Sequence, residues 1–415
     1  MKKIYYQLTF RQTAPLRIGS GSGEQTDLDV LRDSRGMPFL PGSAIAGALR
    51  DRLPHLEAKR LMGDLSAPAP DGKTVVQESL LRVCDAVLPA SALFTVQHRD
   101  GVGINERGTA IPGAKYDFEV VECNEPYIGV LELVDDVPDE LETALETALR
   151  QWVRFGAHFG ARTTRGYGSM TVAVRKKICE DLPVWLDFDP LANDAFADAE
   201  VLAPSDENDG AEIRLRAELR MQGSFTVRVN SAAPESDDAM NPPDLIPLLN
   251  VGGQPVIPGT SWAGTFRHHM LELAHDLALD PQAVETLFGS AAGQKERSRI
   301  RFGETAIEGS KSYVYTRNAV DRYTGAPRNQ ALFTERYAYG GTGVLEILLP
   351  AYTDKGLLDL LAVSMIDLDL GLLSAGGEGG VGRGVCEIMR LSRNGADVTA
   401  ALKAQDASFL RKGDC

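Results

Sequence analysis

The sequence predicts an α+β protein built from two copies of one domain. The segment PFLPGSAIAGALR at 38–50 returns as PVIPGTSWAGTFR at 255–267. At matching separations, Asp27 in TDLDVLRD pairs with Asp244 in PDLIPLLN, and the glycine pair of RGYGSM pairs with that of VGRGVC. A repeat of this extent indicates a duplicated and fused domain. The 415 residues suffice for two domains of about 200 residues, each with its own core.

The elements of the first copy follow from periodicity and turn residues. Residues 4–10 alternate as a strand, and residues 37–40 form a short apolar strand that ends at Pro41. We expect Ser43 to cap a helix through AIAGALRDRL. The remaining expected elements are a strand at 80–87, a polar excursion at 96–121 that returns as a strand, an amphipathic helix at 139–157, the turn GARTTRGYG and a last strand at 170–174.

The second copy repeats this order of elements. The expected elements are a strand at 214–219, a strand at 254–257, a helix at 261–275, a strand at 299–306, an excursion at 313–339, a helix at 356–370 and the turn GGEGGVGRG. This order predicts a ferredoxin-like βαββαβ unit with insertions in each copy, which is a common platform for RNA. We expect domains at 1–178 (copy one) and 213–390 (copy two), followed by a tail at 391–415.

An acidic segment lies between the copies. From residue 178 to residue 213 the chain contains many Asp and Glu residues and no Lys or Arg, and it is rich in Pro and Ala. We expect residues 179–212 to form a solvated linker. Since this segment carries most of the net charge of -15, the rest of the chain is nearly balanced and can present a basic face to a polyanion.

Cysteine usage and hydropathy indicate the compartment. The five cysteines are scattered, with no CxxC, so the sequence predicts neither a disulfide framework nor a zinc ribbon. No apolar run approaches the roughly 20 residues needed to span a bilayer. We expect a cytoplasmic protein that does not contact the membrane.

Several longer motifs extend along nearly the whole chain. Copy one contains PLRIGSG, the segment from TDLDVLRD to GALR, LMG and GARTTRGYGSM, and copy two contains LFGS, RIRFGETAI and YTRNAVDRYTGAPRNQALFTERY. Together they resemble the RAMP superfamily of CRISPR systems, and in particular the backbone subunit that polymerises along the guide RNA in type III effector complexes. A fused two-copy subunit is similar to that of type III-D systems. The resemblance implies that each excursion forms a thumb hairpin, with Arg107 matching Arg322 and Glu119 matching Glu335.

The candidate RNA-binding residues lie at turns, helix starts and strand ends. Glycine-rich turns leave backbone N–H groups uncovered, and arginines in them add bidentate donors for phosphate. Helix starts after Pro-Gly are further phosphate candidates, although helix capping alone also explains them. Arg17 and Arg228 occupy matching places after the first strand of each copy, as phosphate ligands or as solvated strand-end residues. The full set is Arg17, Ser43, Arg50, Arg107, Arg162, Arg165, Arg228, Thr260, Arg267, Arg322 and Arg383.

Asp27 and Asp244 are the candidate catalytic residues. The resemblance implies an aspartate at this place, in a loop beside the target strand, in members that cut RNA. RNA can be cut by its own ribose 2′-OH, so a carboxylate that positions this group or holds Mg²⁺ or Mn²⁺ near the phosphate meets the chemical need. Each could instead be a loop aspartate that stabilises a turn. The nearby competitors are Asp29 and Asp33 in copy one and Asp237 and Asp238 in copy two; we expect Asp33 to be a turn residue.

The resemblance thus implies a metal-dependent endoribonuclease that cuts target RNA at two sites. Its expected partners are a crRNA guide, the complementary target RNA, a large polymerase-like subunit and neighbouring backbone subunits. Two other hypotheses remain: a non-catalytic crRNA-binding backbone subunit, and a guide-processing endonuclease, which is disfavoured because no histidine lies near the candidate loops.

Overall fold

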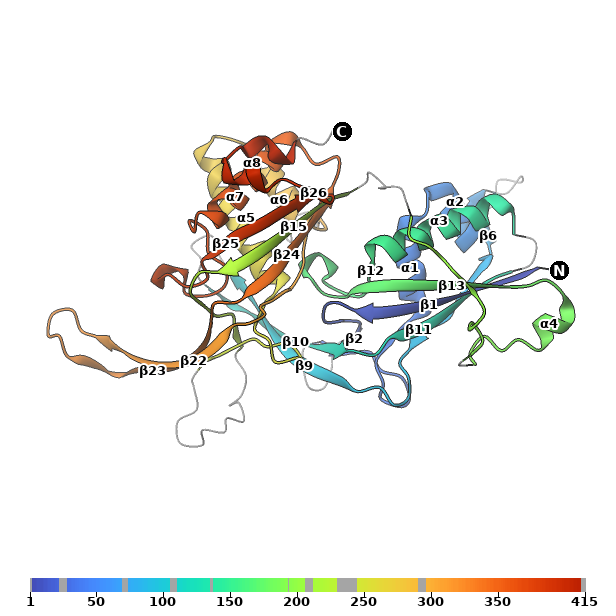
Figure 1. Cartoon of the computed structure of the whole chain (residues 1–415), viewed down its shortest axis with the longest axis horizontal. Coiled ribbons are helices and arrows are strands. Elements are labelled where there is room, and N and C mark those ends of the chain that lie inside the picture. The colour runs from blue at the N-terminus through green and yellow to red at the C-terminus, as the bar shows by residue number, and fades with distance from the viewer. Residues whose placement is uncertain are drawn as a thin grey trace. The chain divides into compact units, whose positions relative to one another are not determined.

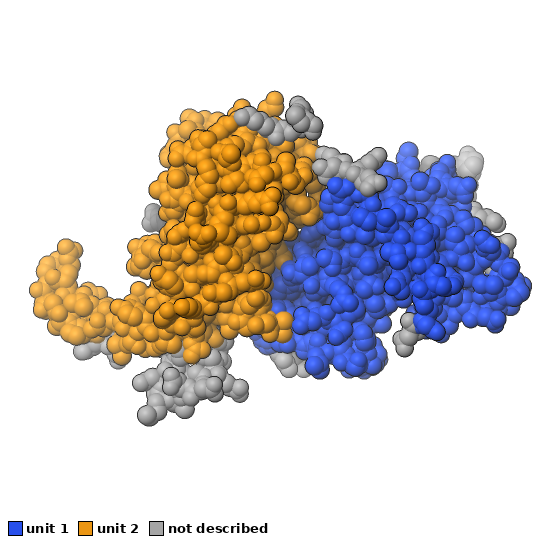
Figure 2. Space-filling view, in the orientation of Figure 1, with its two compact units in different colours: residues 1–98, 117–163, 167–209 blue, residues 99–116, 164–166, 210–415 orange. Residues whose placement is uncertain are grey.

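The described residues form two compact units. The computed structural model describes residues 2–21, 28–68, 74–104, 110–134, 137–192, 194–205, 212–229, 245–289 and 296–411. Unit 1 comprises residues 1–98, 117–163 and 167–209, and unit 2 comprises residues 99–116, 164–166 and 210–415 (Figure 2). Two segments that belong to copy one in sequence, 99–116 and 164–166, therefore cluster with unit 2.

Copy one contributes an antiparallel sheet covered by helices (Figure 1). Its described elements are, in chain order, β1 (Lys3–Gln12), β2 (Gly19–Gly21), β3 (Asp29–Val30), β4 (Phe39–Leu40), α1 (Gly42–Arg52), α2 (His55–Met62), β5 (Asp64–Pro68), β6 (Thr74–Gln77), β7 (Leu81–Val83), β8 (Ala86–Val87), β9 (Phe94–Ile104), β10 (Ala110–Cys123), β11 (Tyr127–Leu133), α3 (Asp139–Phe155), β12 (Ala157–His158), the 3-10 turn η1 (Thr163–Arg165), β13 (Ser169–Cys179), α4 (Leu182–Leu186) and β14 (Glu200–Val201).

The strand order of unit 1 is that of a ferredoxin-like fold. β1 lies between β11 and β13 and is antiparallel to both, so that Tyr6 pairs with Leu131 on one side and Lys176 on the other. β7 and β8 continue the sheet beyond β11. Apolar side chains of α3 recur every third or fourth residue and pack on the even-numbered side chains of β1, which gives one buried core. The α+β class predicted for copy one is confirmed, and its antiparallel sheet is consistent with the predicted ferredoxin-like unit.

Copy two repeats this architecture within unit 2. Its described elements are β15 (Glu212–Met221), β16 (Ser224–Phe225), β17 (Arg228–Val229), β18 (Ile246–Pro247), β19 (Val256–Ile257), α5 (Gly259–Asp276), α6 (Pro281–Phe288), β20 (Arg301–Phe302), β21 (Thr305–Ala306), β22 (Lys311–Val320), β23 (Pro327–Tyr339), β24 (Thr342–Pro350), α7 (Lys355–Asp369), η2 (Gly379–Val381), β25 (Cys386–Arg393), β26 (Ala396–Asp397), α8 (Thr399–Lys403) and η3 (Ala407–Leu410). Its sheet runs β20–β24–β15–β25–β26, with antiparallel pairs, and α5 and α7 contribute to the core.

The segment between the copies is not a solvated spacer along its whole length. Trp185 donates from Nε1 to the hydroxyl of Tyr5 (2.8 Å), Phe188 contacts the Tyr5 ring, and Phe196 is buried. β14 adds to the sheet edge at β13. The linker prediction is therefore wrong for residues 179–205, because the outer face of the sheet, where Tyr5 lies, is apolar and this segment covers it.

The boundary expected at residue 390 lies inside β25, which continues to Arg393. Among the residues after it, Leu402, Phe409 and Leu410 are buried in the core of unit 2. Residues 391–411 are thus part of the folded unit.

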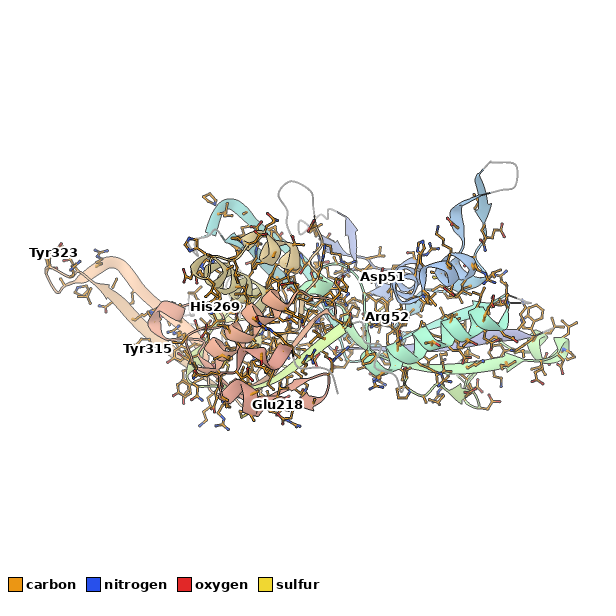
Figure 3. The ribbon with its side chains drawn as sticks, turned by 90° about the horizontal axis from the view of Figure 1, so that it is seen from above. Asp51, Arg52, Glu218, His269, Tyr315 and Tyr323 are labelled. Carbon is orange, nitrogen blue, oxygen red and sulfur yellow. The ribbon has the colours of Figure 1, made fainter. Side chains whose placement is uncertain are left out.

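A long hairpin extends from unit 2 as an arm. β22 and β23 pair antiparallel from Lys311 opposite Tyr339 to Val320 opposite Pro327, and the arm ends in the turn around Tyr323 (Figures 1 and 3). In copy one, β9 and β10 form the corresponding hairpin. Both excursions read from the sequence are therefore hairpins. No helix of the described ranges is long and apolar enough to cross a membrane.

Candidate nucleic-acid interface

The glycine turn of copy one gathers two arginines around one aromatic ring. Arg162 has a left-handed backbone (φ 62°), and its guanidinium lies 4.8 Å from the centre of the Phe118 ring. Arg17 lies over the same ring at 4.9 Å and is itself buried. Cations over an aromatic face are attracted to its negative quadrupole. The arrangement places two guanidinium groups beside the turn. Guanidinium groups can bind phosphate through paired N–H donors.

The matching turn of copy two is built differently. Glu378 has the backbone conformation of Arg162 (φ 63°), and its carboxylate pairs with both Arg317 and Arg383. Glu335 is buried and also pairs with both arginines, each at 3.1 Å. The hydrogen bond that Arg317 donates to the Glu378 carboxylate is the main reason why the pKa of Arg317 is raised. Two arginines and two glutamates thus form one charge-balanced cluster at this turn.

Backbone hydrogen bonds correct one predicted correspondence. The carbonyl of Arg17 accepts from the N–H of Ala161 (2.8 Å), and the carbonyl of Thr226 accepts from the N–H of Gly377 (2.9 Å). Arg17 therefore corresponds to Thr226, and the predicted match with Arg228 is wrong. Arg228 opens β17 instead, opposite Pro247. The match made from the sequence was therefore shifted by two residues in the second copy.

A second correspondence is also shifted by one residue. The N–H of Glu119 donates to the carbonyl of Leu28 (3.2 Å), whereas the N–H of Arg336 donates to the carbonyl of Leu245 (2.9 Å). Glu119 thus corresponds to Arg336 and not to Glu335. In a strand, a shift of one residue moves a side chain to the other face. Glu119 consequently faces the loop, where it accepts from the N–H of Val30 (2.9 Å).

The candidate catalytic residues Asp27 and Asp244 lie outside the described residues, as do Arg107, Asp237 and Asp238. Their chain neighbours Leu28 and Leu245 are described, and they occupy equivalent places beside β10 and β23. Among the competitors, Asp29 lies in β3. Asp33 accepts from the N–H groups of Arg35 (2.8 Å) and Met37 (2.9 Å), and the bond from Met37 is the main reason why the pKa of Asp33 is lowered. The prediction that Asp33 is a turn residue is confirmed.

The helix starts differ from their prediction. Pro41 precedes α1 at the cap position, without a side-chain cap bond, and the N–H of Gly42 donates to the carboxylate of Asp85 (2.7 Å). Ser43 is therefore inside the helix and is exposed, and the prediction that it caps the helix is wrong. Asp85 provides the negative charge that a helix N-terminus favours, and it occupies the place expected for a phosphate. Thr260 likewise lies inside α5, after Pro258 at the cap position.

The other predicted arginines have intramolecular contacts or lie on the arm. Arg50 donates to the carbonyls of Met62 (2.9 Å) and Gly63 at the end of α2, while Arg267 lies 3.8 Å from Glu285. Within unit 2, Arg165 donates to the carbonyl of Phe288 (3.0 Å). The remaining members of the predicted set are Arg322, which is exposed next to Tyr323 at the tip of the arm, and Arg228, whose side chain lies outside the described part of the structure.

Sequence reasoning missed a tyrosine face on the arm. Tyr313 stacks on Tyr337, with ring centres 6.2 Å apart, and contacts Tyr339 edge-on. Tyr315 follows on the same face, because side chains alternate along a strand (Figure 3). The period of two in YVYTR was the available sequence pattern. Exposed aromatic rings offer stacking surfaces for bases.

The described residues contain no group of three or more His, Cys, Asp or Glu side chains that could hold a metal ion. Comparison with protein families gives one match: the model of the RAMP superfamily matches residues 9–171 and 241–387. No curated protein matches the chain. The two matched regions fall in the two copies and together cover most of the sequence.

Proposed function

Because the chain belongs to the RAMP superfamily, we propose that it is a fused two-copy backbone subunit of a type III CRISPR effector complex, similar to the type III-D form, which cuts target RNA at two sites. Membership of the superfamily indicates a CRISPR-associated protein that binds crRNA and other effector subunits. In the proposal each copy holds one segment of the guide. Base pairing selects the target sequence, while the protein contacts the RNA backbones.

One observation carries the proposal of two cleavage loops. Leu28 and Leu245 accept equivalent backbone hydrogen bonds from β10 and β23, so the two leucines occupy the same place beside the hairpin of their copy. The residue before each leucine is an aspartate, Asp27 or Asp244. An aspartate directly before the same backbone position in each copy supports the proposal of two cuts with a fixed spacing.

The proposed cut uses the target RNA as its own nucleophile. The 2′-oxygen attacks the adjacent phosphorus, the bond from phosphorus to the 5′-oxygen breaks, and the products end in a 2′,3′-cyclic phosphate and a 5′-hydroxyl. The 2′-OH proton leaves to a base, and the departing 5′-oxygen takes up a proton. A loop carboxylate that accepts a hydrogen bond from the 2′-OH would orient this group and take its proton.

We propose that cleavage depends on Mg²⁺ or Mn²⁺. Within the described ranges, no three metal-ligating side chains lie close enough together to bind such an ion by themselves. Such an ion would have the loop carboxylate and the RNA phosphates as ligands, and would neutralise charge at the cleaved phosphate. The proposed setting is the cytoplasm, and the proposed partners are the crRNA, the target RNA, a large polymerase-like subunit and further backbone subunits.

The test is cleavage of an end-labelled complementary RNA by the complex purified with its guide, with Mg²⁺, with Mn²⁺ and with EDTA. Wild type should give two cuts. Asp27→Ala should reduce one cut by about a hundredfold or more, since general acid-base groups contribute this much, and Asp244→Ala should reduce the other. Guide retention should not change, because the carboxylate acts mainly in the transition state.

Asp29→Asn and Asp238→Asn are the matched controls, and both should leave the two cuts intact. Persistence of both products in both alanine variants would disprove the assignment of the aspartates. A wild-type complex that retains guide RNA and cuts nothing would instead support the non-catalytic backbone subunit.

A further inference from the structure

Glu119 connects a histidine to the segment that follows the proposed cleavage residue of copy one, all within unit 1. Its N–H donates to the carbonyl of Leu28 (3.2 Å), and its carboxylate accepts from the N–H of Val30 (2.9 Å) and from the guanidinium of Arg32 (3.3 Å). On the neighbouring strand β9, Nε2 of His98 lies 3.8 Å from the same carboxylate. The hairpin therefore brings His98 next to this segment, although it lies far from it in the sequence.

The two side chains differ in exposure. The side chain of Glu119 is 3% exposed, whereas that of His98 is 54% exposed. The carboxylate is thus held inside by its hydrogen bonds, and the imidazole is accessible from solution. A carboxylate beside an imidazole orients the ring and accepts a hydrogen bond from its protonated form.

The charged groups near the imidazole come from both strands of the hairpin and from the segment beside β10. Side chains alternate along a strand, so every second residue of β9 and β10 shares the face of His98. These charged residues are Asp29, Arg32, Asp100, Lys115, Asp117 and Glu119, with Lys115 at 3.5 Å from Asp100. Among these residue types and histidine, only histidine ordinarily changes its charge between pH 5 and 8.

Copy two has neither the glutamate nor the histidine at the equivalent positions. Glu119 corresponds to Arg336, as the hydrogen bonds to Leu28 and Leu245 show. Val314 lies opposite Arg336 in the hairpin of copy two, as His98 lies across the hairpin from Glu119. A valine has no proton to give, and an arginine keeps its proton throughout the neutral range.

The third member of the cluster is also replaced. The isolated bridge between Arg32 and Pro38 recurs between Leu249 and Pro255, so Leu249 occupies the place of Arg32. The arginine, glutamate and histidine of copy one are therefore leucine, arginine and valine in copy two. The two copies differ most in chemistry beside the position where each is proposed to cut.

We propose that His98 is the general acid of the cut made by copy one, with Glu119 as its positioning residue. An ionised carboxylate can take the 2′-OH proton but has none to give to the departing 5′-oxygen. As the bond from phosphorus to the 5′-oxygen breaks, the imidazolium gives its proton to that oxygen, and the neutral ring later regains a proton from water. The inference rests on the proposed function and adds a residue that makes the two cuts unequal.

The pH dependence of the two cuts tests the role of His98. The rates of both cuts are measured in single turnovers with an end-labelled complementary RNA, from pH about 6 to about 8. Both cuts use an aspartate for the 2′-OH proton, so that step cancels in the ratio of cut one to cut two. In wild type the ratio should fall as pH rises, because imidazolium is lost above the ordinary histidine pKa of about 6.5. In His98→Ala cut one should slow by about a hundredfold at low pH, and the ratio should no longer depend on pH.

Added imidazole separates catalysis from structure. In His98→Ala, imidazole in the buffer should restore part of cut one and leave cut two unchanged, whereas a purely structural role would not respond to it. Val314→Ala changes the equivalent position of copy two and should leave both rates unchanged. His55→Ala removes an exposed histidine at the start of α2 and should do the same. Guide RNA content is measured in every sample and should match wild type.

Three outcomes would overturn the inference: an unaltered cut one in His98→Ala, equal slowing of both cuts, or a wild-type ratio that does not change with pH. If Asp27→Ala abolishes cut one while His98→Ala leaves it intact, only this inference fails. If the wild-type complex retains guide RNA and cuts nothing, the proposed cleavage fails, and the role of His98 fails with it.

Discussion

Arg162 and Glu378 occupy one position in two turns of the same shape, with φ angles of 62° and 63°. In copy one this position and Arg17 lie over Phe118, whereas in copy two it completes a cluster with Glu335, Arg317 and Arg383. The same backbone thus carries an arginine in one copy and a glutamate in the other. We expect the two turns to contribute unequally to RNA binding.

The first prediction concerns this inequality. Arg162→Ala should weaken guide RNA retention and lower the slope of log affinity against log salt by about one, because one phosphate contact is lost. Arg390→Ala is the control, since Arg390 pairs with Asp397 on the surface. RNA affinity is measured by filter binding at several salt concentrations. A slope equal to wild type would contradict the prediction.

The second prediction concerns Glu335, which is buried between two arginines. Glu335→Ala should lower the free energy of unfolding by about 3 kcal/mol, because it leaves two arginines, of which Arg383 is buried, with Glu378 as their shared carboxylate. The measurement is urea unfolding of the full chain, following the transition of unit 2. Arg390→Ala removes a surface ion pair with Asp397 and should leave that transition nearly unchanged. Equal effects of the two changes would show that the cluster adds no more than a surface pair.

At the scale of the element, the arm depends on its tip. Asp321 accepts from the N–H groups of Tyr323 and Thr324, both at 3.0 Å, and closes the turn between β22 and β23. These bonds, that from Thr324 first, hold the pKa of Asp321 below its ordinary value. A carboxylate with a lowered pKa stabilises the fold above its ordinary pKa, about 3.9, and this contribution is lost as pH falls through the lowered value.

The third prediction follows from the lowered pKa of Asp321. The amide resonances of Tyr323 and Thr324 should shift only below pH about 3.9, when Asp321 takes up its proton. In Asp321→Ala that acid shift should be absent, the tip should exchange amide protons faster, and target cleavage should be less sharply placed. Sharp cuts from this variant would indicate that the tip does not position RNA.

At the scale of the whole molecule, residues 179–205 of the acidic segment are part of unit 1 and do not form a solvated linker. Its aromatic residues cover the outer face of the first sheet, where Phe196 is 1% exposed beside Phe188.

The fourth prediction is that Phe196→Ala lowers the unfolding free energy of unit 1 by about 3 kcal/mol, which is typical of a buried phenylalanine. Leu191→Ala, at a side chain 78% exposed, is the control. The measurement is denaturant unfolding of both variants. If the two variants were equally stable, the segment would be a solvated spacer, as the sequence predicted.

The duplicated pattern was sufficient to predict the fold of each copy. The repeated Pro-Gly-helix segment, the alternating strands and the amphipathic α3 are local features whose period reflects the face that is buried. The sequence did not predict the short helices α2 and α6, because the hydrophobic period of a helix repeats only about twice in eight residues. The tyrosine face is visible in the sequence as alternating tyrosines. Alternation alone does not show whether the tyrosines face the core or the solvent, because that depends on how the strand packs.

The sequence by itself determined the duplication, the order of elements and the two candidate aspartates, because these depend on residues that are close in the chain. Only the tertiary structure decided that Glu119 corresponds to Arg336, that Asp85 and not Ser43 bonds the start of α1, and that Arg99 pairs with Glu304. Each of these depends on which distant groups meet once strand register and packing are set. A shift of one residue or one short insertion changes the partner while leaving the local pattern intact.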